Sequence, residues 1–333
     1  MTEIVDREPN EMADPFSFNT GAAEVGGGDA LAQTMLELAE QRDDIVLVAP
    51  DIGAGPATAA FVERYPERFF DVGIAENNSV SVAAGLAASG LRPFVLGMGA
   101  FLALKCAEQI RTDIAFNHLP VMLVSAWGGV EMGYFGTSHH ALEDFAVLRG
   151  IPNLVVAAAA DHNAARALIR LGVERGEPMY MRAEPTGGPV VYEKPPELEF
   201  GKLRLLRDGS GVCLVGCGIT VSSALQASDL LASQGVDAAV VDLTFIKPFD
   251  DEGIRALANR FPNIVVAEEH NSTAGIGSLI AESLGRAGIV AQLATLGFPD
   301  EDLAVAFPVQ LFERYGVDAQ SIAEQAQAMV GAK

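Results

Sequence analysis

Short apolar runs alternate with longer amphipathic stretches along most of this chain. Runs rich in valine, leucine and isoleucine that are bounded by glycine, proline or polar residues are typical of buried strands. We expect strands at residues 45–50, 68–73, 92–97, 120–126, 153–158 and 179–183, and further along at 211–218, 236–243, 263–269 and 289–297. Strands that alternate with helices form a mainly parallel sheet with helices on both faces. The pattern therefore predicts an α/β fold with two doubly wound domains.

The clearest helix pattern follows the strand expected at residues 68–73. Its apolar residues recur at the i, i+3, i+4, i+7 spacing of one helix face, at Val80, Ala83, Ala84 and Ala87. Asn77 and Asn78 precede them and are residue types that cap helix starts. Glu76 then lies just before or at the start of the helix, after a tight turn at Gly73.

Two explanations fit the position of Glu76. A carboxylate at a helix start interacts favourably with the helix dipole in any protein. Helix starts that face the carboxyl ends of strands are also the usual ligand-binding edge of a doubly wound sheet. Glu76 is therefore a candidate site residue, and a purely structural role is the alternative.

The 333-residue chain is long enough for two domains. Residues 1–25 are polar and end in a Gly-rich stretch, which predicts a flexible arm. The first domain is expected at 26–190, and a Pro- and Glu-rich stretch predicts a linker at 191–202. The second α/β domain is expected at 203–333.

Charge and cysteine content narrow the function classes. The formal net charge is -22 at pH 7, which repels nucleic acid and anionic membranes and favours a small-molecule or protein partner. No apolar run reaches the roughly 18 residues of a membrane span, and the acidic N-terminus does not resemble a signal peptide. We interpret Cys106, Cys213 and Cys217 as buried, reduced thiols rather than metal ligands. These features indicate a cytoplasmic protein.

Six segments together resemble the transketolase family, and they cover nearly the whole chain after residue 26. The most informative is FFDVGIAENNSVSVAAGLAASGLRPFV, which looks like the family's pyrimidine-binding segment with its G-I-A-E motif. The others lie at 101–121, 133–156, 179–187, 240–254 and 265–284. Each motif is moderately specific, and their shared order and spacing are highly specific. The resemblance implies a thiamine-diphosphate pyrimidine-binding domain followed by a transketolase C-terminal-like domain.

The resemblance also implies roles for residues in the first domain. Glu76 would hydrogen-bond N1′ of the aminopyrimidine of thiamine diphosphate and take part in catalysis. Phe101 aligns with the aromatic residue that stacks on this ring, and a core phenylalanine is the alternative. Asp51, Ile52 and Met98 are expected beside the cofactor, where Met98 and Leu104 replace aromatic residues of the family.

For the substrate, His139 occupies the position of a histidine that binds substrate and can move protons at its oxygens. His140 stands where the family usually has glutamine. Arg182 matches an arginine that often holds a substrate phosphate, with a surface ion pair as the alternative. His270, in the second domain, is interpreted as structural or interfacial.

Several polar substrate contacts of the family are replaced in this sequence. Phe135 stands in place of an aspartate and Trp127 in place of a histidine. Glycines stand near two further positions, at Gly28 and at Gly53 or Gly55. An apolar wall cannot satisfy a sugar hydroxyl, and each unpaired buried polar group costs about 1–3 kcal/mol. The hypothesis follows that the acceptor is less polar than a sugar phosphate, or carries no phosphate.

The diphosphate-binding half of a transketolase, which starts with G-D-G, is not found in this sequence. The resemblance therefore implies a partner subunit that carries this domain and the ligands of Mg²⁺. A heterotetramer with two copies of each subunit is expected. Its reaction would transfer a two-carbon ketol unit from a ketose donor to an aldehyde-type acceptor.

Three alternatives remain open at this point. The β subunit of 2-oxoacid dehydrogenases shares the two-domain plan and also lacks the diphosphate-binding half. The deoxyxylulose phosphate synthases are similar but are normally one chain. A non-catalytic homologue with a binding role would explain the replaced substrate residues, although retention of Glu76 and His139 is against it.

Overall fold

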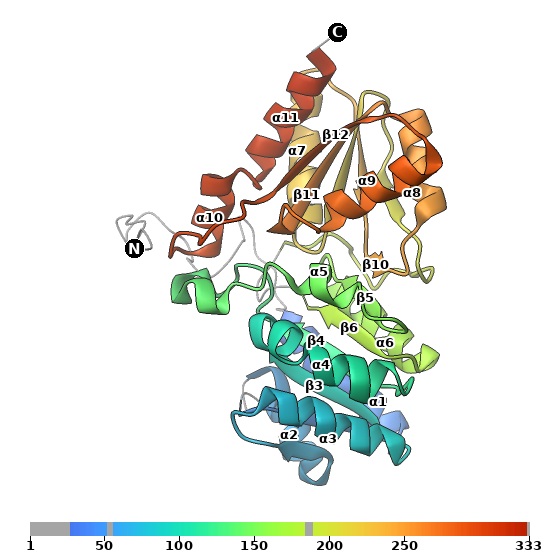
Figure 1. The fold of residues 1–333 in the computed structure, drawn as a ribbon, viewed down its shortest axis with the longest axis vertical. Helices are drawn as coiled ribbons and strands as arrows, with labels where there is room; N and C mark the ends of the chain where they lie inside the picture. The colour runs from blue at the N-terminus through green and yellow to red at the C-terminus, as the bar shows by residue number, and fades with distance from the viewer. Residues whose placement is uncertain (1–26, 52–55, 184–188, 332–333) are drawn as a thin grey trace.

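The computed structural model describes residues 27–51, 56–183 and 189–331. They form two α/β units, each built on its own sheet, and the units lie one above the other in Figure 1. The predicted N-terminal arm falls outside the described residues, as do Ile52, Gly53 and Gly55.

The lower unit contains a seven-stranded sheet. Its first six strands are β1 (Ile45–Ala49), β2 (Phe69–Asp71), β3 (Arg92–Met98), β4 (Met122–Ala126), β5 (Val155–Ala158) and β6 (Met179–Arg182). They are parallel and lie in the order β5-β6-β4-β3-β1-β2. The seventh strand, β10 (Phe245–Lys247), comes from the second half of the chain and pairs antiparallel with β5.

Helices cover both faces of this sheet, as the alternating pattern predicts. One face packs on α1 (Gly27–Gln41), α2 (Pro56–Arg64) and α6 (His162–Arg175). The other packs on α3 (Glu76–Ala88), the wide-turned helices η3 (Ala100–Lys105) and η4 (Ile110–Ala115) with α4 (Ala107–Gln109) between them, and α5 (Asp144–Leu148). Short 3-10 turns, η2 (Pro66–Arg68), η5 (Gly133–Phe135) and η6 (Thr137–His139), complete the unit.

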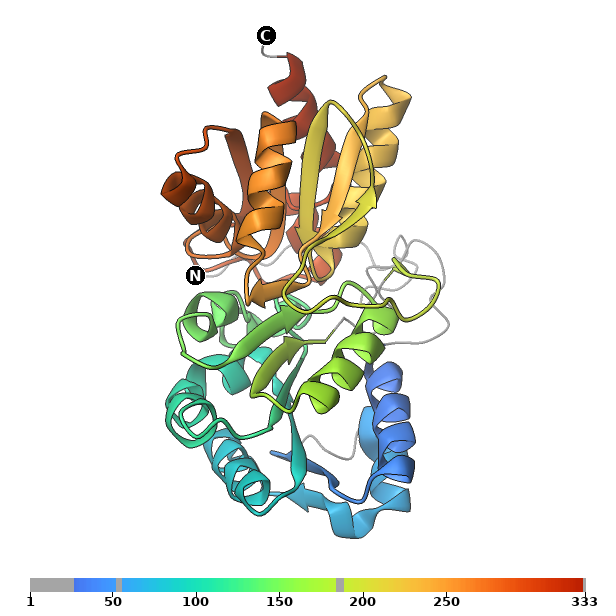
Figure 2. The same cartoon turned by 90° about the vertical axis from the view of Figure 1, so that its right-hand side faces the viewer.

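The upper unit has a five-stranded sheet in the order β12-β11-β8-β9-β7. Its strands are β7 (Arg204–Arg207), β8 (Val212–Cys217), β9 (Ala238–Asp242), β11 (Asn263–Asn271) and β12 (Gln292–Phe298). α7 (Thr220–Ser233) and α11 (Ala319–Gly331) pack on one face, and α8 (Asp251–Arg260) and α9 (Ile276–Ala287) on the other. Figure 2 shows these layers from the side, and α10 (Pro308–Tyr315) lies toward the lower unit in Figure 1.

Every strand predicted from the apolar runs is present, with ends that differ by a few residues. The two strands that the pattern missed are β7 and β10, and both are short antiparallel additions to a sheet edge. The prediction that Asn77 and Asn78 cap a helix is wrong. α3 begins earlier, at Glu76, and its N-cap residue is Ala75, which makes no side-chain capping hydrogen bond.

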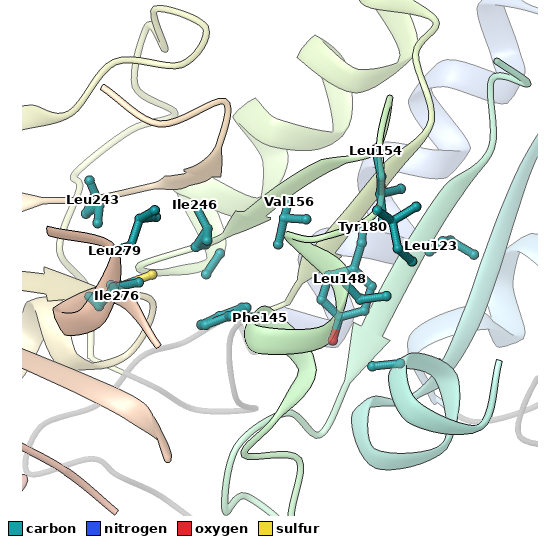
Figure 3. Packing of buried hydrophobic residues seen from close by; sticks show 14 of the residues in the cluster. Leu123, Phe145, Leu148, Leu154, Val156, Tyr180, Leu243, Ile246, Ile276 and Leu279 are labelled. Carbon is teal, nitrogen blue, oxygen red and sulfur yellow. The ribbon is translucent and has the colours of Figure 1, made fainter. Parts of the chain in front are cut away.

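A shared apolar core joins the two units. One cluster of buried residues includes Phe145 and Tyr180 from the lower unit together with Ile246 and Ile276 from the second half of the chain. Figure 3 shows Ile246 lying between Val156 and Leu243, so the cluster continues across the boundary. The two units therefore bury apolar surface against each other, which fixes the position of the lower sheet's edge relative to the upper unit.

The three cysteines are buried and unpaired, as predicted. Burial raises the pKa of Cys106 and Cys213 to about 12, so these thiols stay protonated and unreactive. Within the described ranges, no helix combines the length and apolar character needed to cross a bilayer.

Candidate active site

The carboxyl ends of the parallel strands bring the predicted site residues to one edge of the lower sheet. Asp51 follows β1, Met98 ends β3, Trp127 follows β4, and Arg182 ends β6. Neighbouring strands are in register here, with Met98 opposite Ala126 and Ser125 opposite Arg182. Parallel strands present their carboxyl ends at the same edge, where ligands of such sheets bind.

Glu76 is placed at this edge by the turn after β2. Gly73 adopts a positive φ of 70°, which glycine reaches without steric cost, and the amide of Ala75 donates to the Gly73 carbonyl at 2.6 Å. α3 then begins with Glu76 itself. Although it is the first residue of a helix, Glu76 is only 7% exposed. A solvated helix-dipole partner does not require such burial, so the functional explanation gains support.

Lys105 contacts Glu76 directly. Its Nζ donates to Oε2 of Glu76 at 2.6 Å. Burial raises the pKa of Glu76, but hydrogen bonding to Lys105 and the nearby positive charge outweigh it, and the pKa lies below its usual value. Glu76 is therefore ionised in this structure.

Aromatic rings line the next part of the edge. Phe101, on η3, meets the ring of His139 edge-on, with centroids 5.2 Å apart. Phe135 stacks on the same imidazole at 4.8 Å and 26°. Phe135 is 56% exposed, so part of its ring remains open to solvent. His139 is thus enclosed by two aromatic side chains that the sequence placed in different motifs.

The two adjacent histidines point to different surroundings, as predicted for neighbouring residues. Nδ1 of His139 lies 3.0 Å from Oγ of Ser138, and the ring is half-buried. His140 is buried, and its Nε2 lies 3.3 Å from the carbonyl of Gly133. Burial lowers the pKa of His140, which favours its neutral form. Of the pair, His139 is the one suited to proton transfer with a ligand.

Asp51 and Trp127 share an unusual backbone. Both have positive φ, 63° for Asp51 and 51° for Trp127, which is uncommon for residues other than glycine. The amide of Asp51 donates to Asp71 Oδ1 at 3.2 Å, and the same oxygen accepts from Gly73 at 2.8 Å. Asp71 therefore ties the loop after β1 to the turn that carries Glu76. Left-handed conformations of this kind are concentrated at functional sites.

Arg182 does not fit the anion-binding role predicted for it. Its side chain is 6% exposed, and all five N–H groups have protein acceptors. Nε and one terminal nitrogen bind Asp144, and the remaining bonds go to Ala141 and to the carbonyl and carboxylate of Glu269. Burial disfavours the cation, but Asp144 and Glu269 outweigh it and raise the pKa of Arg182. Arg182 is therefore a structural tie, with no N–H left for a substrate phosphate.

This tie crosses between the two units. Glu269 lies on β11 of the upper sheet, and its Oε1 also accepts from the amide of Val130 at 2.9 Å. His270 follows it and stacks on Phe145 with parallel rings 5.5 Å apart. The interpretation of His270 as structural fits this packing.

The neighbouring Glu268 makes a pH effect testable. It is 1% exposed, its Oε2 accepts from the amide of Ile276 at 2.6 Å, and its Oε1 is buried without a hydrogen-bond partner among the described residues. Burial raises its pKa to about 7. Between about pH 5 and 7 the folded chain holds a proton that the unfolded chain has released, so this residue's stabilising contribution is lost as pH rises through about 7.

We expect Glu268→Gln to remove this loss, because glutamine keeps an acceptor for Ile276 and does not ionise. The melting temperature of the variant minus that of the wild type should rise between pH 5 and pH 8 in calorimetric scans. Glu301→Gln, at an exposed carboxylate, is the control. A difference that stays constant over this pH range would contradict the assignment.

Three residues of the site were missed in the sequence. Lys105 lies in one of the family-like segments, and a lysine four residues after Phe101 was a usable signal. Asp144 was visible only as one acid among many. Phe307 packs on Tyr134 at 5.6 Å and supports the loop that carries Phe135, but it comes from the distant second half of the chain. Sequence spacing contains no signal for such a contact.

Comparisons with known proteins agree with the two-unit division. Residues 24–185 match the family model of the transketolase pyrimidine-binding domain, and residues 201–322 match that of the transketolase C-terminal domain. One of the two kinds of subunit of an apulose-4-phosphate transketolase from Phocaeicola vulgatus is 35% identical over 302 residues, which are 90% of this chain and 96% of that relative.

A 1-deoxy-D-xylulose-5-phosphate synthase from Syntrophotalea carbinolica is 36% identical over 318 residues. These residues are 93% of this chain but only 50% of the synthase, so the chain spans half of that enzyme. A solved structure described as a split-gene transketolase in an inactive β4 tetramer superposes with a TM-score of 0.83 at 32% identity. It covers 93% of this chain and 99% of its own.

Proposed function

Because this chain belongs to the transketolase family, we propose that it is the pyrimidine-binding subunit of a split, thiamine-diphosphate-dependent enzyme. That enzyme transfers a two-carbon ketol unit from a ketose donor to an aldehyde-type acceptor. The observation that carries the proposal is the buried carboxylate of Glu76 at the ligand-binding edge of the lower sheet.

The residues around Glu76 fit the aminopyrimidine of thiamine diphosphate. Glu76 is a buried acceptor long enough to reach a ring nitrogen and share a proton with it. Phe101 and Met98 supply apolar surface at the same edge, from η3 and the end of β3. When bound, the cofactor supplies the carbon nucleophile and the electron sink for the two-carbon fragment.

In this proposal the chain's own residues bind and move protons. Glu76 holds a proton at the pyrimidine ring nitrogen and thereby selects its tautomer. His139, enclosed by Phe101 and Phe135, exchanges protons with the oxygens of the substrate. Asp51 lies near the bound cofactor, and Trp127 lines the substrate side.

The proposal assigns the diphosphate and Mg²⁺ to a partner subunit. In the described part of the chain, no group of three or more His, Cys, Asp or Glu side chains is arranged to hold a metal ion. The relative with matching length is named as a lettered subunit of its transketolase, and the related split-gene protein is described as inactive in its β4 form. Both names support an active assembly with a second polypeptide, for which we propose two copies of each subunit.

The acceptor is proposed to be less polar than a sugar phosphate. Arg182 has no free donor for a phosphate, and Phe135 presents an exposed ring where the family has an aspartate. A buried hydroxyl left unpaired against such a ring costs about 1–3 kcal/mol. A non-phosphorylated aldehyde with an apolar substituent fits this surface better.

The test begins with gentle purification of the tagged chain from its native host. A co-purifying chain that bears the G-D-G motif, together with thiamine-diphosphate-dependent turnover of a ketose, supports the proposal. The donor panel includes a 2-oxoacid, because turnover of that donor alone would instead support the dehydrogenase alternative. A chain that purifies alone and binds no thiamine diphosphate with Mg²⁺ would contradict the proposed function.

With the assembled enzyme, apolar aldehydes should be preferred over pentose phosphates as acceptors. Phe135→Asp should shift the ratio of kcat/KM values toward polyhydroxylated acceptors by about ten-fold or more, because a carboxylate can pair with a hydroxyl. Phe116→Asp is the matched control, at a phenylalanine that is 76% exposed on η4's far end. Unchanged acceptor ratios in Phe135→Asp would contradict the specificity role.

A further inference from the structure

The ion pair between Lys105 and Glu76 occupies the atom that the proposed cofactor contact needs. Lys105 Nζ lies 2.6 Å from Glu76 Oε2. The carboxylate side chain is 9% exposed, whereas the lysine side chain is 51% exposed. Lys105 therefore approaches Glu76 from the solvent side and covers a carboxylate that is otherwise enclosed by protein.

The backbone of Lys105 is held in place for this contact. Asn77 Nδ2 donates to the Lys105 carbonyl at 2.7 Å and to Gln109 Oε1 at 2.7 Å. Lys105 ends the wide-turned helix η3, whose geometry is rare and frequent at functional sites. Phe101 lies on the same helix, so one short element presents both the apolar ring and the cation to the pocket of Glu76.

The ammonium group and a pyrimidine nitrogen make opposite demands on Glu76. An adjacent cation favours the ionised carboxylate, and the pKa of Glu76 lies below its usual value despite its burial. Sharing a proton with a ring nitrogen requires a carboxyl with a higher proton affinity. A ring donor also needs the lone pairs that Lys105 now occupies. Both partners cannot serve Glu76 at once.

We propose that Lys105 is a cofactor-exchange residue: it pairs with Glu76 before the cofactor binds and is displaced by the aminopyrimidine. The inference rests on the proposed function. Its exposed side chain can swing into solvent once released, at little cost. While the pair is closed, the chain is not competent to bind the ring, and the apparent affinity for the cofactor falls by the competent fraction.

The test measures cofactor binding directly, by titration calorimetry of thiamine diphosphate with Mg²⁺ into the assembled complex. Lys105→Met removes the ammonium group and keeps an apolar stem, so its Kd should be about five- to ten-fold lower than that of the wild type. Lys105→Arg retains a cation and should bind close to the wild type. Lys194→Met, at an exposed lysine in the segment between the two units, is the control. The KM for the cofactor should follow the Kd across the series.

The outcomes separate this inference from the proposed function. Equal Kd values for the wild type and Lys105→Met, or weaker binding by Lys105→Met, would overturn the exchange role alone. Weaker binding would show instead that Lys105 contacts the bound cofactor. No binding by the wild-type complex would overturn the proposed function and this inference with it.

Discussion

Glu76→Gln is expected to lower kcat of the assembled enzyme by about 10²–10⁴-fold, the usual contribution of a positioned acid–base group. Glutamine has nearly the shape of glutamate and can still accept from Lys105, but it cannot exchange a proton with a ring nitrogen. The loss should therefore persist at saturating thiamine diphosphate. Steady-state kinetics measures it, and circular dichroism should show an unchanged fold.

Glu63→Gln is a suitable control because Glu63 is an exposed glutamate on α2, a helix of the opposite face. Its activity should match that of the wild type. Turnover by Glu76→Gln within a few-fold of the wild type would remove the central residue from the proposed mechanism. The helix-dipole explanation of Glu76 would then be sufficient.

Arg182→Met is expected to lower the free energy of unfolding by about 3–5 kcal/mol, the usual cost of removing one partner of a buried ion pair. The variant leaves Asp144 and Glu269 buried without their cation. Both carboxylates lie at the boundary of the two units, so the loss should loosen the upper unit from the lower one. Urea unfolding followed by circular dichroism measures the effect.

Arg149→Met provides the comparison, since Arg149 also pairs with a carboxylate of the upper unit, Glu282. Glu282 is 48% exposed, and surface pairs of this kind contribute about 0–1 kcal/mol. Similar small losses in both variants would contradict the structural role of Arg182. A stable Arg182→Met that loses only substrate affinity would restore the phosphate-binding prediction.

The sequence predicted the fold well because it depends on local patterns. Apolar runs and helical spacing are properties of neighbouring residues, and they located the strands and the helix that begins at Glu76. The resemblance then singled out Phe101 and His139, whose rings lie 5.2 Å apart. Motif order was enough to bring these residues to one edge, because parallel strands share the position of their carboxyl ends.

The errors arose where function depends on which side chains meet. Arg182 looked like a free cation at a strand end, but Glu269 reaches it from 87 residues away. Lys105 lies in a helical segment with no sign of a charged partner, and its contact with Glu76 spans 29 residues. Buried charges are fixed by partners that satisfy them, and neither partner is visible from spacing. The asparagine cap failed for a related reason, because Asn77 bonds to Lys105 instead of to its own helix start.

Strand β10 affects how such proteins can be recombined. It follows β9 of the upper sheet in the chain, yet it completes the lower sheet beside β5. A fragment ending near residue 200 would keep the whole first family region but present the edge of β5 unpaired, and open edges recruit other chains. Ile246 would also be missing from the core around Val156. Exchange of the C-terminal region between relatives must therefore preserve this strand, and the two regions are inherited as one unit although two family models describe them.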